Sequence, residues 1–435
     1  MTQEYQSRRR RRLTATITDL EVAVQRAFLI GVQLPGMSVE EAERSLSELA
    51  LLTDTAGSDP VDQELVRRQV IDAGTFIGSG KADELAGLTK ALDIDVVVFD
   101  NDLTPAQQRN LMSVFGCDVV DRQALILDIF AQHAHSKEGA LQVELALLRY
   151  HLPRLRGKGK ALSQQAGGIG TRGPGETKLE TDRRRILARI SKLERDLVDT
   201  AGHRETQRKS RRRSRIPQVA IVGYTNAGKS TLLNALTDAG ALVEDRLFAT
   251  LDPTVRRLDL PDGRRVLVAD TVGFVRRLPH HLVEAFKSTL AEATESDLLV
   301  HVVDGTEPDP AGQIAAVREV LSEIGAAEVP ELLVINKLDA VDAPHRDRLR
   351  NVYPDAVPIS ALRGDGLDDL VESLSALTTP KSVTLSLEIP YDRGDIVAAA
   401  HRLGEVTGEK HDENGTILDV RLPTALTARF TDFTR

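Results

Sequence analysis

The sequence has no tryptophan, and aromatic residues make up only 3% of its 435 positions. Hydrophobic residues still account for 41%, so its cores must be built mainly from aliphatic side chains. The single cysteine, Cys117, excludes an internal disulfide and fits a reducing compartment. No apolar run reaches the roughly 20 residues of a membrane span, and the start of the chain lacks the apolar core of a signal peptide. We therefore expect a cytoplasmic protein with no membrane span.

Positive charge is concentrated in one segment of an otherwise acidic chain. The formal net charge is −9, which by itself argues against binding to nucleic acid. Residues 149–215 depart from this average, because they hold 20 lysines and arginines against 7 acidic residues, a net charge of +13. Such segregation can place a site for a polyanion on a protein that is acidic overall.

Changes in composition and periodicity divide the chain into five parts. They are a disordered basic lead-in (1–24), an N-terminal α/β domain (25–150), a glycine-rich basic loop with a helical hairpin (151–213), a second α/β domain (214–379) and a small α+β domain (380–435). In the first α/β domain, Val96–Phe99 predicts a buried strand, and Ser38 and Thr104 each predict the N-cap of a helix. Leucines at helical spacing continue over residues 125–149.

The hairpin is predicted from a heptad pattern. Residues 157–175 are rich in glycine and have too few apolar side chains to form a core. Apolar residues seven apart follow, namely Leu179, Ile186 and Leu193 in one series and Ile190 and Leu197 in another. This repeat predicts a two-helix hairpin or a short coiled coil. We interpret the basic residues 204–215 as a linker.

Short apolar runs alternate with helical stretches in the second α/β domain. The runs are Val219–Val222, Val266–Ala269, Leu298–Val303, Leu332–Ile335 and Val357–Ile359. Their alternation predicts a mainly parallel sheet that is covered by helices on both faces. In the small last domain, two strand-like runs flank Asn414-Gly415, a pair that favours a hairpin turn.

The first of these runs leads into a pattern that binds phosphate. It is followed by Gly223-Tyr-Thr-Asn-Ala-Gly228-Lys229-Ser230 and then by a helix-forming sequence. Glycines at this spacing let backbone N–H groups surround phosphate oxygens at a helix N-terminus. We expect Lys229 to reach the β- and γ-phosphates and Ser230 to ligate magnesium.

Two later segments are predicted to respond to the γ-phosphate, as the switches of GTPases do. In Asp270-Thr-Val-Gly273, the aspartate is placed to hold magnesium, directly or through water, and the Gly273 amide to meet the γ-phosphate. In Phe248-Ala-Thr-Leu-Asp-Pro-Thr254, Thr250 is the candidate ligand of magnesium and the γ-phosphate, with Thr254 as the alternative.

A fourth motif predicts which base is bound. Asn336-Lys-Leu-Asp339 follows a strand, and a carboxylate there can accept from guanine N1–H and the 2-amino group, donors that adenine lacks at those positions. Asn336 is expected to support the loop and the base, and Lys337 to pack along the plane of the base. Ser360-Ala-Leu362 matches the remaining loop that covers the base.

Together these motifs predict a Ras-like P-loop GTPase domain with a mixed, mainly parallel sheet over residues 214–379, which binds GTP or GDP with Mg²⁺. The predicted nucleotide contacts are Gly223, Tyr224, Thr225, Asn226, Ala227, Gly228, Lys229, Ser230, Thr231, Phe248, Ala249, Thr250, Leu251, Asp252, Asp270, Thr271, Val272, Gly273, Asn336, Lys337, Leu338, Asp339, Ser360, Ala361 and Leu362. The predicted magnesium ligands are Ser230, Thr250 and Asp270.

The catalytic group is not identified by the sequence. Many GTPases place a glutamine after the glycine of the second switch to orient the attacking water, but here Phe274 cannot hydrogen-bond to water. We therefore expect slow intrinsic hydrolysis that a partner must complete. We interpret Arg276 and Arg277 as facing solvent or RNA rather than acting as arginine fingers.

The chain resembles the HflX family of ribosome-associated GTPases from about Arg26 onward. The resemblance is strongest in Leu141-Gln-Val-Glu-Leu-Ala-Leu-Leu-Arg-Tyr with Leu152-Pro-Arg-Leu, in Gly167-Gly-Ile-Gly-Thr-Arg-Gly-Pro-Gly-Glu-Thr-Lys-Leu-Glu180, and in the two switches. That family also has an apolar residue where glutamine usually stands. The arginine-rich start and the form of the C-terminal domain depart from the family pattern.

The resemblance implies a factor that binds the large ribosomal subunit and splits or rescues stalled or idle ribosomes. The N-terminal domain and the hairpin would reach rRNA near the peptidyl-transferase region, and the ribosome would stimulate GTP hydrolysis. Such a protein would be cytoplasmic, partly ribosome-associated and monomeric when free. Two other interpretations are a signalling GTPase with a protein partner and an NTP-driven RNA-remodelling factor. The guanine-reading Asp339 argues against an ATP-driven version of the latter.

Overall fold

The computed structural model describes residues 24–155, 174–213, 216–237, 247–248, 250–251, 253–276, 287–379 and 382–435. The chain divides into two compact units, Met1–Leu370 and Val371–Arg435. The predicted disordered lead-in, apart from Val24, and most of the glycine-rich stretch lie outside the described residues. None of the described helices is both long enough and apolar enough to cross a membrane.

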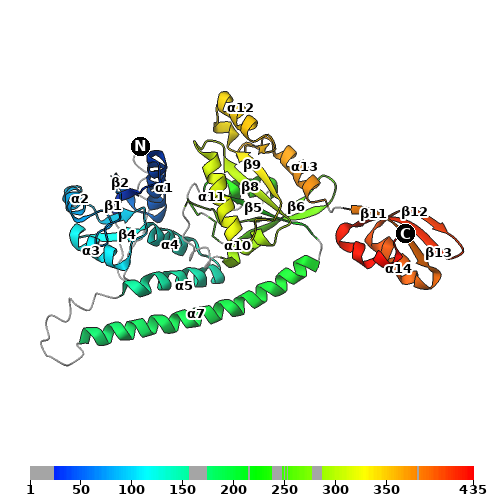
Figure 1. The fold of residues 1–435 in the computed structure, drawn as a ribbon, viewed down its shortest axis with the longest axis horizontal. Coiled ribbons are helices and arrows are strands. Elements are labelled where there is room, and N and C mark those ends of the chain that lie inside the picture. Colours follow the sequence, from blue (N-terminus) through cyan, green and yellow to red (C-terminus); the bar gives the residue numbers. More distant parts are fainter. Residues whose placement is uncertain are drawn as a thin grey trace, which may run out of the picture. The chain divides into compact units, whose positions relative to one another are not determined.

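The N-terminal α/β domain is built on a four-stranded parallel sheet, of which Figure 1 labels β1, β2 and β4. Its strands, in the order β2-β1-β3-β4, are β2 (Asp59–Arg67), β1 (Arg26–Gln33), β3 (Val96–Phe99) and β4 (Asp118–Asp121). The connecting helices are α1 (Val39–Ala56), α2 (Ser79–Ala91) and α3 (Pro105–Phe115), and α4 (Arg122–His133) follows the last strand. The predicted α/β fold of this domain is confirmed.

Both predicted helix starts are confirmed in this domain. Ser38 accepts a hydrogen bond from the Glu41 amide at 3.0 Å. Thr104 and Gln107 form a reciprocal capping box, with Pro105 in the first turn of α3. Residues 125–149, where leucines have helical spacing, are helical but form two helices, because α4 ends at His133 and Ser136 caps a new helix, α5 (Lys137–Arg154).

Helix α5 packs against α7 (Pro174–Arg213), a single helix of 40 residues (Figure 1). Leu145, Ile190 and Leu193 are buried in the seam between them. Partly buried residues extend the seam, namely Leu141, Leu148, Leu152, Ile186 and Leu197. Residues 174–213 thus form one helix instead of a hairpin, and its partner α5 lies mostly before the segment 151–213 in which the helical pair was predicted. The predicted linker is wrong over residues 204–213, because α7 continues through them.

The second α/β domain contains a six-stranded sheet in the order β10-β9-β8-β5-β7-β6. The strands are β5 (Gln218–Gly223), β6 (Thr254–Asp259), β7 (Arg265–Asp270), β8 (Leu298–Asp304), β9 (Glu331–Asn336) and β10 (Val357–Pro358). Helices α8 (Lys229–Thr237), α10 (Lys287–Thr294), α11 (Pro310–Glu323), α12 (Ala343–Val352) and α13 (Leu367–Leu377) accompany them. All pairs are parallel except β6–β7, so the predicted mixed, mainly parallel sheet is confirmed.

The C-terminal unit holds a three-stranded antiparallel sheet in the order β11-β13-β12. Its elements are β11 (Ser382–Pro390), α14 (Gly394–Leu403), β12 (Glu405–His411) and β13 (Gly415–Pro423). The predicted hairpin at Asn414-Gly415 joins β12 to β13. The core of the C-terminal unit contains Leu387, Ile396, Val420 and Phe430. The division between the two compact units falls after Leu370, inside α13, whereas the sequence predicted a boundary after residue 379.

Candidate nucleotide site

The phosphate loop connects the central strand β5 to helix α8, at the carboxyl edge of the sheet where ligands of open α/β folds bind. Gly223, Asn226 and Gly228 have positive φ angles of 149°, 59° and 91°. A Cβ atom at Gly228 would overlap the side chain of Asn336, so the close approach of these two loops requires glycine.

Lys229 lies buried at the start of α8, where its Nζ donates to the Tyr224 carbonyl at 2.7 Å. Burial lowers the pKa of Lys229 to about 8, although the charge of Asp270 acts in the opposite direction. A buried ammonium group that is held this far below its ordinary pKa gains from an anion placed beside it. The site is therefore suited to a phosphate group.

Three side-chain oxygens from separate segments converge next to this lysine. Ser230 Oγ lies 2.6 Å from Asp270 Oδ2 and 2.8 Å from Thr250 Oγ1, and Thr250 donates to Asp270 Oδ2 at 3.1 Å. Thr254, the alternative to Thr250, instead begins strand β6. The structure thus brings Ser230, Thr250 and Asp270 together, as the predicted magnesium ligands require.

The buried carboxylate of Asp270 provides a test of whether a metal ion fits. Its Oδ1 atom is buried and has no hydrogen-bond partner among the described residues. Burial raises the pKa of this carboxyl group, and the charge of Lys229 and the hydrogen bonds from Ser230 and Thr250 only partly oppose that effect. Mg²⁺ prefers oxygen ligands, and its charge would stabilise the ionised carboxylate. The donor set therefore fits Mg²⁺.

The guanine motif is joined to the phosphate loop through Asn336. Its Nδ2 donates to the Ala227 carbonyl at 2.8 Å, and its Oδ1 accepts from the Ala361 amide at 2.9 Å. One buried amide side chain therefore connects the phosphate loop, the end of β9 and the predicted base-covering loop. Lys337 Nζ lies 2.7 Å from Asp304 Oδ2.

Asp339 is held in place to present a carboxylate. Its Oδ1 accepts from Ser360 Oγ at 2.7 Å, and Arg363 lies 3.7 Å from its Oδ2. The hydrogen bond from Ser360, followed by weaker contributions from nearby groups, keeps the pKa of Asp339 below its ordinary value. The carboxylate is therefore ionised at neutral pH and can accept from the base. Leu362 is 79% exposed in the same loop.

The second switch is attached to the phosphate loop by an extra β-bridge. The Thr225 amide donates to the Phe274 carbonyl at 2.7 Å, and the Phe274 amide donates to the Gly223 carbonyl at 3.1 Å. The Phe274 ring is 1% exposed and belongs to the apolar core. A Cβ at Gly273 would come within 2.9 Å of the Thr225 Cα atom, so glycine is required there.

Two predicted nucleotide contacts, Ala249 and Asp252, lie outside the described residues, and so does Arg277. The environment predicted for Arg276 is wrong. Its side chain is paired with Asp309 at 2.9 Å, and its main chain is also held, so it does not simply face solvent. A pairing across 33 positions leaves no local pattern that could have revealed it.

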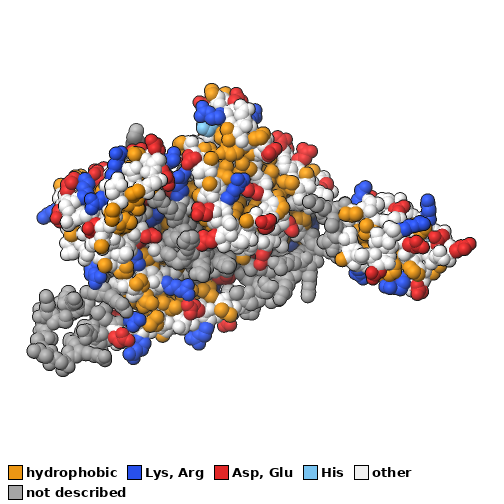
Figure 2. All heavy atoms as spheres, in the orientation of Figure 1, with side chains coloured by type: hydrophobic (Ala, Val, Ile, Leu, Met, Phe, Trp, Pro, Cys, Tyr) orange, Lys and Arg blue, Asp and Glu red, His pale blue; other side chains and the backbone are white. Residues whose placement is uncertain are grey.

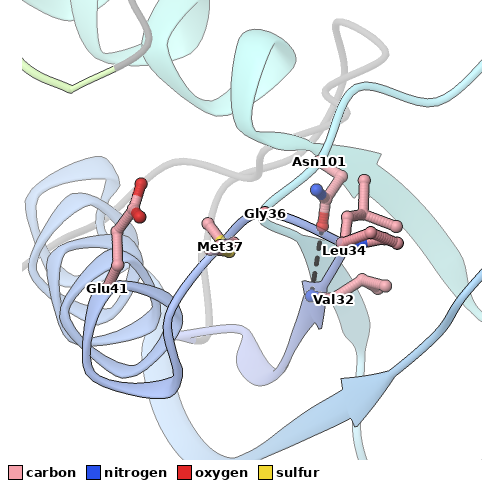
Figure 3. Close-up of a pocket in the computed structure, with 7 residues that line it drawn as sticks. Val32, Leu34, Gly36, Met37, Glu41 and Asn101 are labelled. Carbon is pink, nitrogen blue, oxygen red and sulfur yellow. Dashed lines mark hydrogen bonds between the residues drawn. The ribbon is translucent and has the colours of Figure 1, made fainter.

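A separate cavity of about 330 Å³ lies in the N-terminal domain, near the ends of β1 and β3 (Figure 3). Its lining residues are Val32, Leu34, Pro35, Gly36, Met37, Glu41 and Asn101. Asn101 Oδ1 accepts from the Val32 amide at 3.1 Å. None of these lining residues is a lysine or arginine, and the only charge is that of Glu41. The cavity therefore does not share the phosphate-binding chemistry of the P-loop.

Comparison with known proteins agrees with this geometry. Residues 43–131 match the family described as "GTP-binding GTPase N-terminal", residues 133–211 the "GTP-binding GTPase Middle Region", and residues 218–337 the "50S ribosome-binding GTPase" family. The GTPase HflX of Caldanaerobacter subterraneus subsp. tengcongensis is 46% identical over 409 residues, which cover 94% of each chain.

A second relative and a solved structure are also similar to this chain. The GTPase HflX of Escherichia coli is 44% identical over 381 residues, covering 87% of this chain and 89% of that one. The crystal structure of a GTP-binding protein from the archaeon Sulfolobus solfataricus in complex with GDP aligns at 27% identity with a TM-score of 0.44, over 82% of this chain and 99% of that one. From the identity over nearly the whole chain and the assembled nucleotide loops, this chain belongs to the HflX family of GTPases.

Proposed function

We propose that this GTPase binds the large ribosomal subunit and splits or rescues stalled or idle ribosomes, with GTP hydrolysis stimulated by the ribosome. The match of residues 218–337 to a family described as "50S ribosome-binding GTPase" supports the choice of partner. The observation that carries the proposal is the basic, exposed face of α7, which packs on α5 through its other side. We also propose that the free protein is monomeric and cytoplasmic.

At the nucleotide, we propose the roles predicted from the motifs. The P-loop amides and Lys229 would bind the phosphates, and Asp339 would select guanine through its ionised carboxylate. Ser230, Thr250 and Asp270 would hold Mg²⁺. When bound, this ion neutralises charge on the phosphate oxygens. The Gly273 amide would contact the γ-phosphate, so that the second switch distinguishes GTP from GDP.

We propose slow intrinsic hydrolysis because the residue in the usual glutamine position faces the protein core. The Phe274 ring is buried, and both polar groups of its main chain are bonded to the phosphate loop. It can neither bind nor orient a water molecule. Contact with the ribosome would then supply or reposition the missing group.

The proposed rRNA contact can be tested at the exposed face of α7. Arg183, Arg184 and Arg185 are all exposed, whereas Ile190 and Leu193 are buried against α5. Figure 2 shows lysine and arginine side chains on the surface beside this helical pair. Cations that contact rRNA phosphates release counterions, so binding should weaken steeply as salt concentration rises.

The experiment replaces all three arginines by glutamate and measures binding to purified large subunits across salt concentrations. We expect affinity to fall by about two orders of magnitude or more and the salt dependence to become shallower. The matched control replaces Arg348, Arg350 and Arg402, which are exposed and lie outside the basic segment, and it changes the net charge equally. Affinity for GTP should be unchanged in both proteins. If the α7 variant binds like wild type with the same salt slope, this face only contacts solvent and the rRNA contact lies elsewhere.

A further inference from the structure

The N-terminal domain packs directly on the nucleotide-sensing loops of the GTPase domain, within one compact unit. A continuous buried cluster contains Leu49 and Phe130 from the N-terminal domain together with Phe248, Val272 and Phe274 from the two switches. The Phe130 and Phe248 rings meet edge to face, with centroids 4.7 Å apart and an interplanar angle of 83°. Movement of either switch therefore disturbs the contact between the domains.

A tyrosine in the phosphate loop provides a polar connection through this apolar contact. The Tyr224 hydroxyl donates to Glu48 Oε1 of helix α1 at 2.6 Å and accepts from the Arg276 amide at 2.5 Å. Tyr224 is 6% exposed, so neither hydrogen bond is shared with bulk solvent. Desolvation and the nearby charge of Glu48 raise the pKa of Tyr224, so its hydroxyl keeps the proton that it donates.

Arg122, at the start of α4, also contacts both Glu48 and Arg276. Its Nη2 atom lies 2.8 Å from Glu48 Oε2 and donates to the Arg276 carbonyl at 3.2 Å. Its Nη1 atom donates to Asp100 Oδ1 at 2.8 Å, and Asp100 Oδ2 accepts from Ser45 Oγ at 2.6 Å. The guanidinium group is thus fixed by two carboxylates of its own domain while it binds the main chain of the second switch.

Arg276 is consequently held at three points, three residues after the switch glycine Gly273. Its amide is bound by Tyr224 and its carbonyl by Arg122. Its side chain is paired at 2.9 Å with Asp309, the N-cap of α11, and Arg44 of α1 lies 3.6 Å from the same carboxylate. The apolar contacts would be enough to hold the two domains together. They do not explain why the buried charged groups of Glu48 and Arg122 lie next to the main chain of Arg276, because burying charges is costly.

We propose that Glu48, Arg122 and Tyr224 are positioning residues that hold the main chain of Arg276, and with it Gly273, at the place where the γ-phosphate is sensed. Because the γ-phosphate and the N-terminal domain then favour the same position of the second switch, binding of GTP and docking of the N-terminal domain strengthen each other reciprocally. GDP has no γ-phosphate, so its affinity would not depend on the clamp that Glu48, Arg122 and Tyr224 form. The inference rests on the proposed role of Gly273 and does not depend on the ribosomal partner.

The test uses Tyr224→Phe in the full chain, which removes only the hydroxyl. Tyr150→Phe is a matched control, because Tyr150 is also buried, at 4% exposed, and its hydroxyl donates to Asp121 Oδ1 at 3.0 Å within the N-terminal domain. Affinities for a non-hydrolysable GTP analogue with Mg²⁺ and for GDP are measured by equilibrium titration. Gly273→Ala, whose Cβ would press on Lys229 Nζ and Thr225, reports on the role of Gly273 itself.

We expect Tyr224→Phe to bind the GTP analogue about tenfold more weakly, the factor expected for loss of one hydrogen bond to a charged group. Its affinity for GDP should stay within about twofold, and Tyr150→Phe should change neither affinity. Exchange of the Arg276 amide with solvent should also become faster in Tyr224→Phe alone. If Tyr224→Phe does not fold, Glu48→Gln should give a smaller selective loss in the same direction.

Two results would overturn the clamp. If Tyr224→Phe lowers the affinities for the GTP analogue and for GDP equally, the hydroxyl stabilises the conformation of the phosphate loop and not that of the second switch. Unchanged affinities in Tyr224→Phe, or in Glu48→Gln where that variant replaces it, would mean that these contacts serve packing only. If Gly273→Ala loses the GTP analogue selectively in either case, the proposed role of Gly273 stands and only the clamp fails. If Gly273→Ala has no selective effect, both fail together.

Discussion

Replacement of Asp339 by asparagine tests the assignment of the base site. In the structure, Asp339 Oδ1 already accepts from Ser360 Oγ at 2.7 Å, so the second carboxylate oxygen is the one left to face the base. Asparagine places an N–H₂ group at one of these two positions. That group would confront the guanine N1–H and 2-amino donors without being able to accept from either.

The loss can be estimated from the bonds involved. Each hydrogen bond to a charged group contributes about 1.5–3 kcal/mol, so loss of two corresponds to about 3–6 kcal/mol. Affinity for GTP should therefore fall by a factor of about 10² to 10⁴. Xanthosine triphosphate has a carbonyl in place of the 2-amino group, so it can accept from the new amide and should become the preferred nucleotide.

Equilibrium titration with fluorescent GTP and xanthosine triphosphate measures both effects. Asp342→Asn is the matched control, since Asp342 is a nearby carboxylate that caps α12, where asparagine caps equally well. The control should keep its affinity for GTP. Wild-type GTP affinity in Asp339→Asn would show that the base is bound elsewhere.

Three other predictions concern hydrolysis, the helical pair and the phosphate-loop lysine. Basal GTP turnover should be slow, and Phe274→Gln should raise it in a single-turnover assay; fast turnover of the wild type without a partner would refute our account of this position. Leu193→Ala should lower the free energy of unfolding by about 2–4 kcal/mol in a denaturant titration, because Leu193 is 0% exposed in the α5–α7 seam; a neutral result would contradict that packing. Burial lowers the pKa of Lys229 from 10.5 to about 8, so between these pH values the unfolded chain binds more protons than the folded protein. The free energy of unfolding of the nucleotide-free protein should therefore increase by up to about 3 kcal/mol as the pH rises from 8 to 10.5. That gain should be absent in Lys229→Met, and an identical pH profile for both proteins would contradict the burial of this charge.

Features that depend on local patterns could be predicted from the sequence. The parallel strands of the GTPase domain are short apolar runs, and the phosphate loop, the Asp270 motif and the Asn336 motif each lie at the end of such a run. The carboxyl ends of parallel strands meet at one edge of a sheet, so the order of motifs was enough to bring Ser230, Asp270 and Asn336 into one site. The apolar stripes of α5 and α7 were predicted because their leucines and isoleucines repeat at helical spacing, but the pairing of these two helices was not predicted.

Polar elements were harder to predict. Strand β2 carries mostly charged and polar side chains at the edge of its sheet, so it lacks an alternating apolar signal. Residues 204–213 are almost entirely polar and resemble a linker, yet arginine, lysine, glutamate and glutamine are good helix formers, and α7 continues through them.

Contacts between distant segments could not be read from the sequence at all. Tyr224 and Glu48 are 176 positions apart, and Arg122 and Arg276 are 154 apart. Each contact involves single polar groups with no periodic pattern around them. The chain order of the motifs predicted the nucleotide site, whereas the connection of that site to the N-terminal domain emerged only from the folded structure.

The most direct test of the proposed function is sedimentation of purified ribosomes with the wild-type protein, with large subunits, small subunits and intact ribosomes resolved. Samples contain no nucleotide, GDP, or a non-hydrolysable GTP analogue with Mg²⁺. We predict that the protein sediments with large subunits in the presence of the GTP analogue, releases them with GDP, and converts intact ribosomes into separate subunits. Absence of the protein from the large-subunit fraction in every nucleotide state would contradict the central claim.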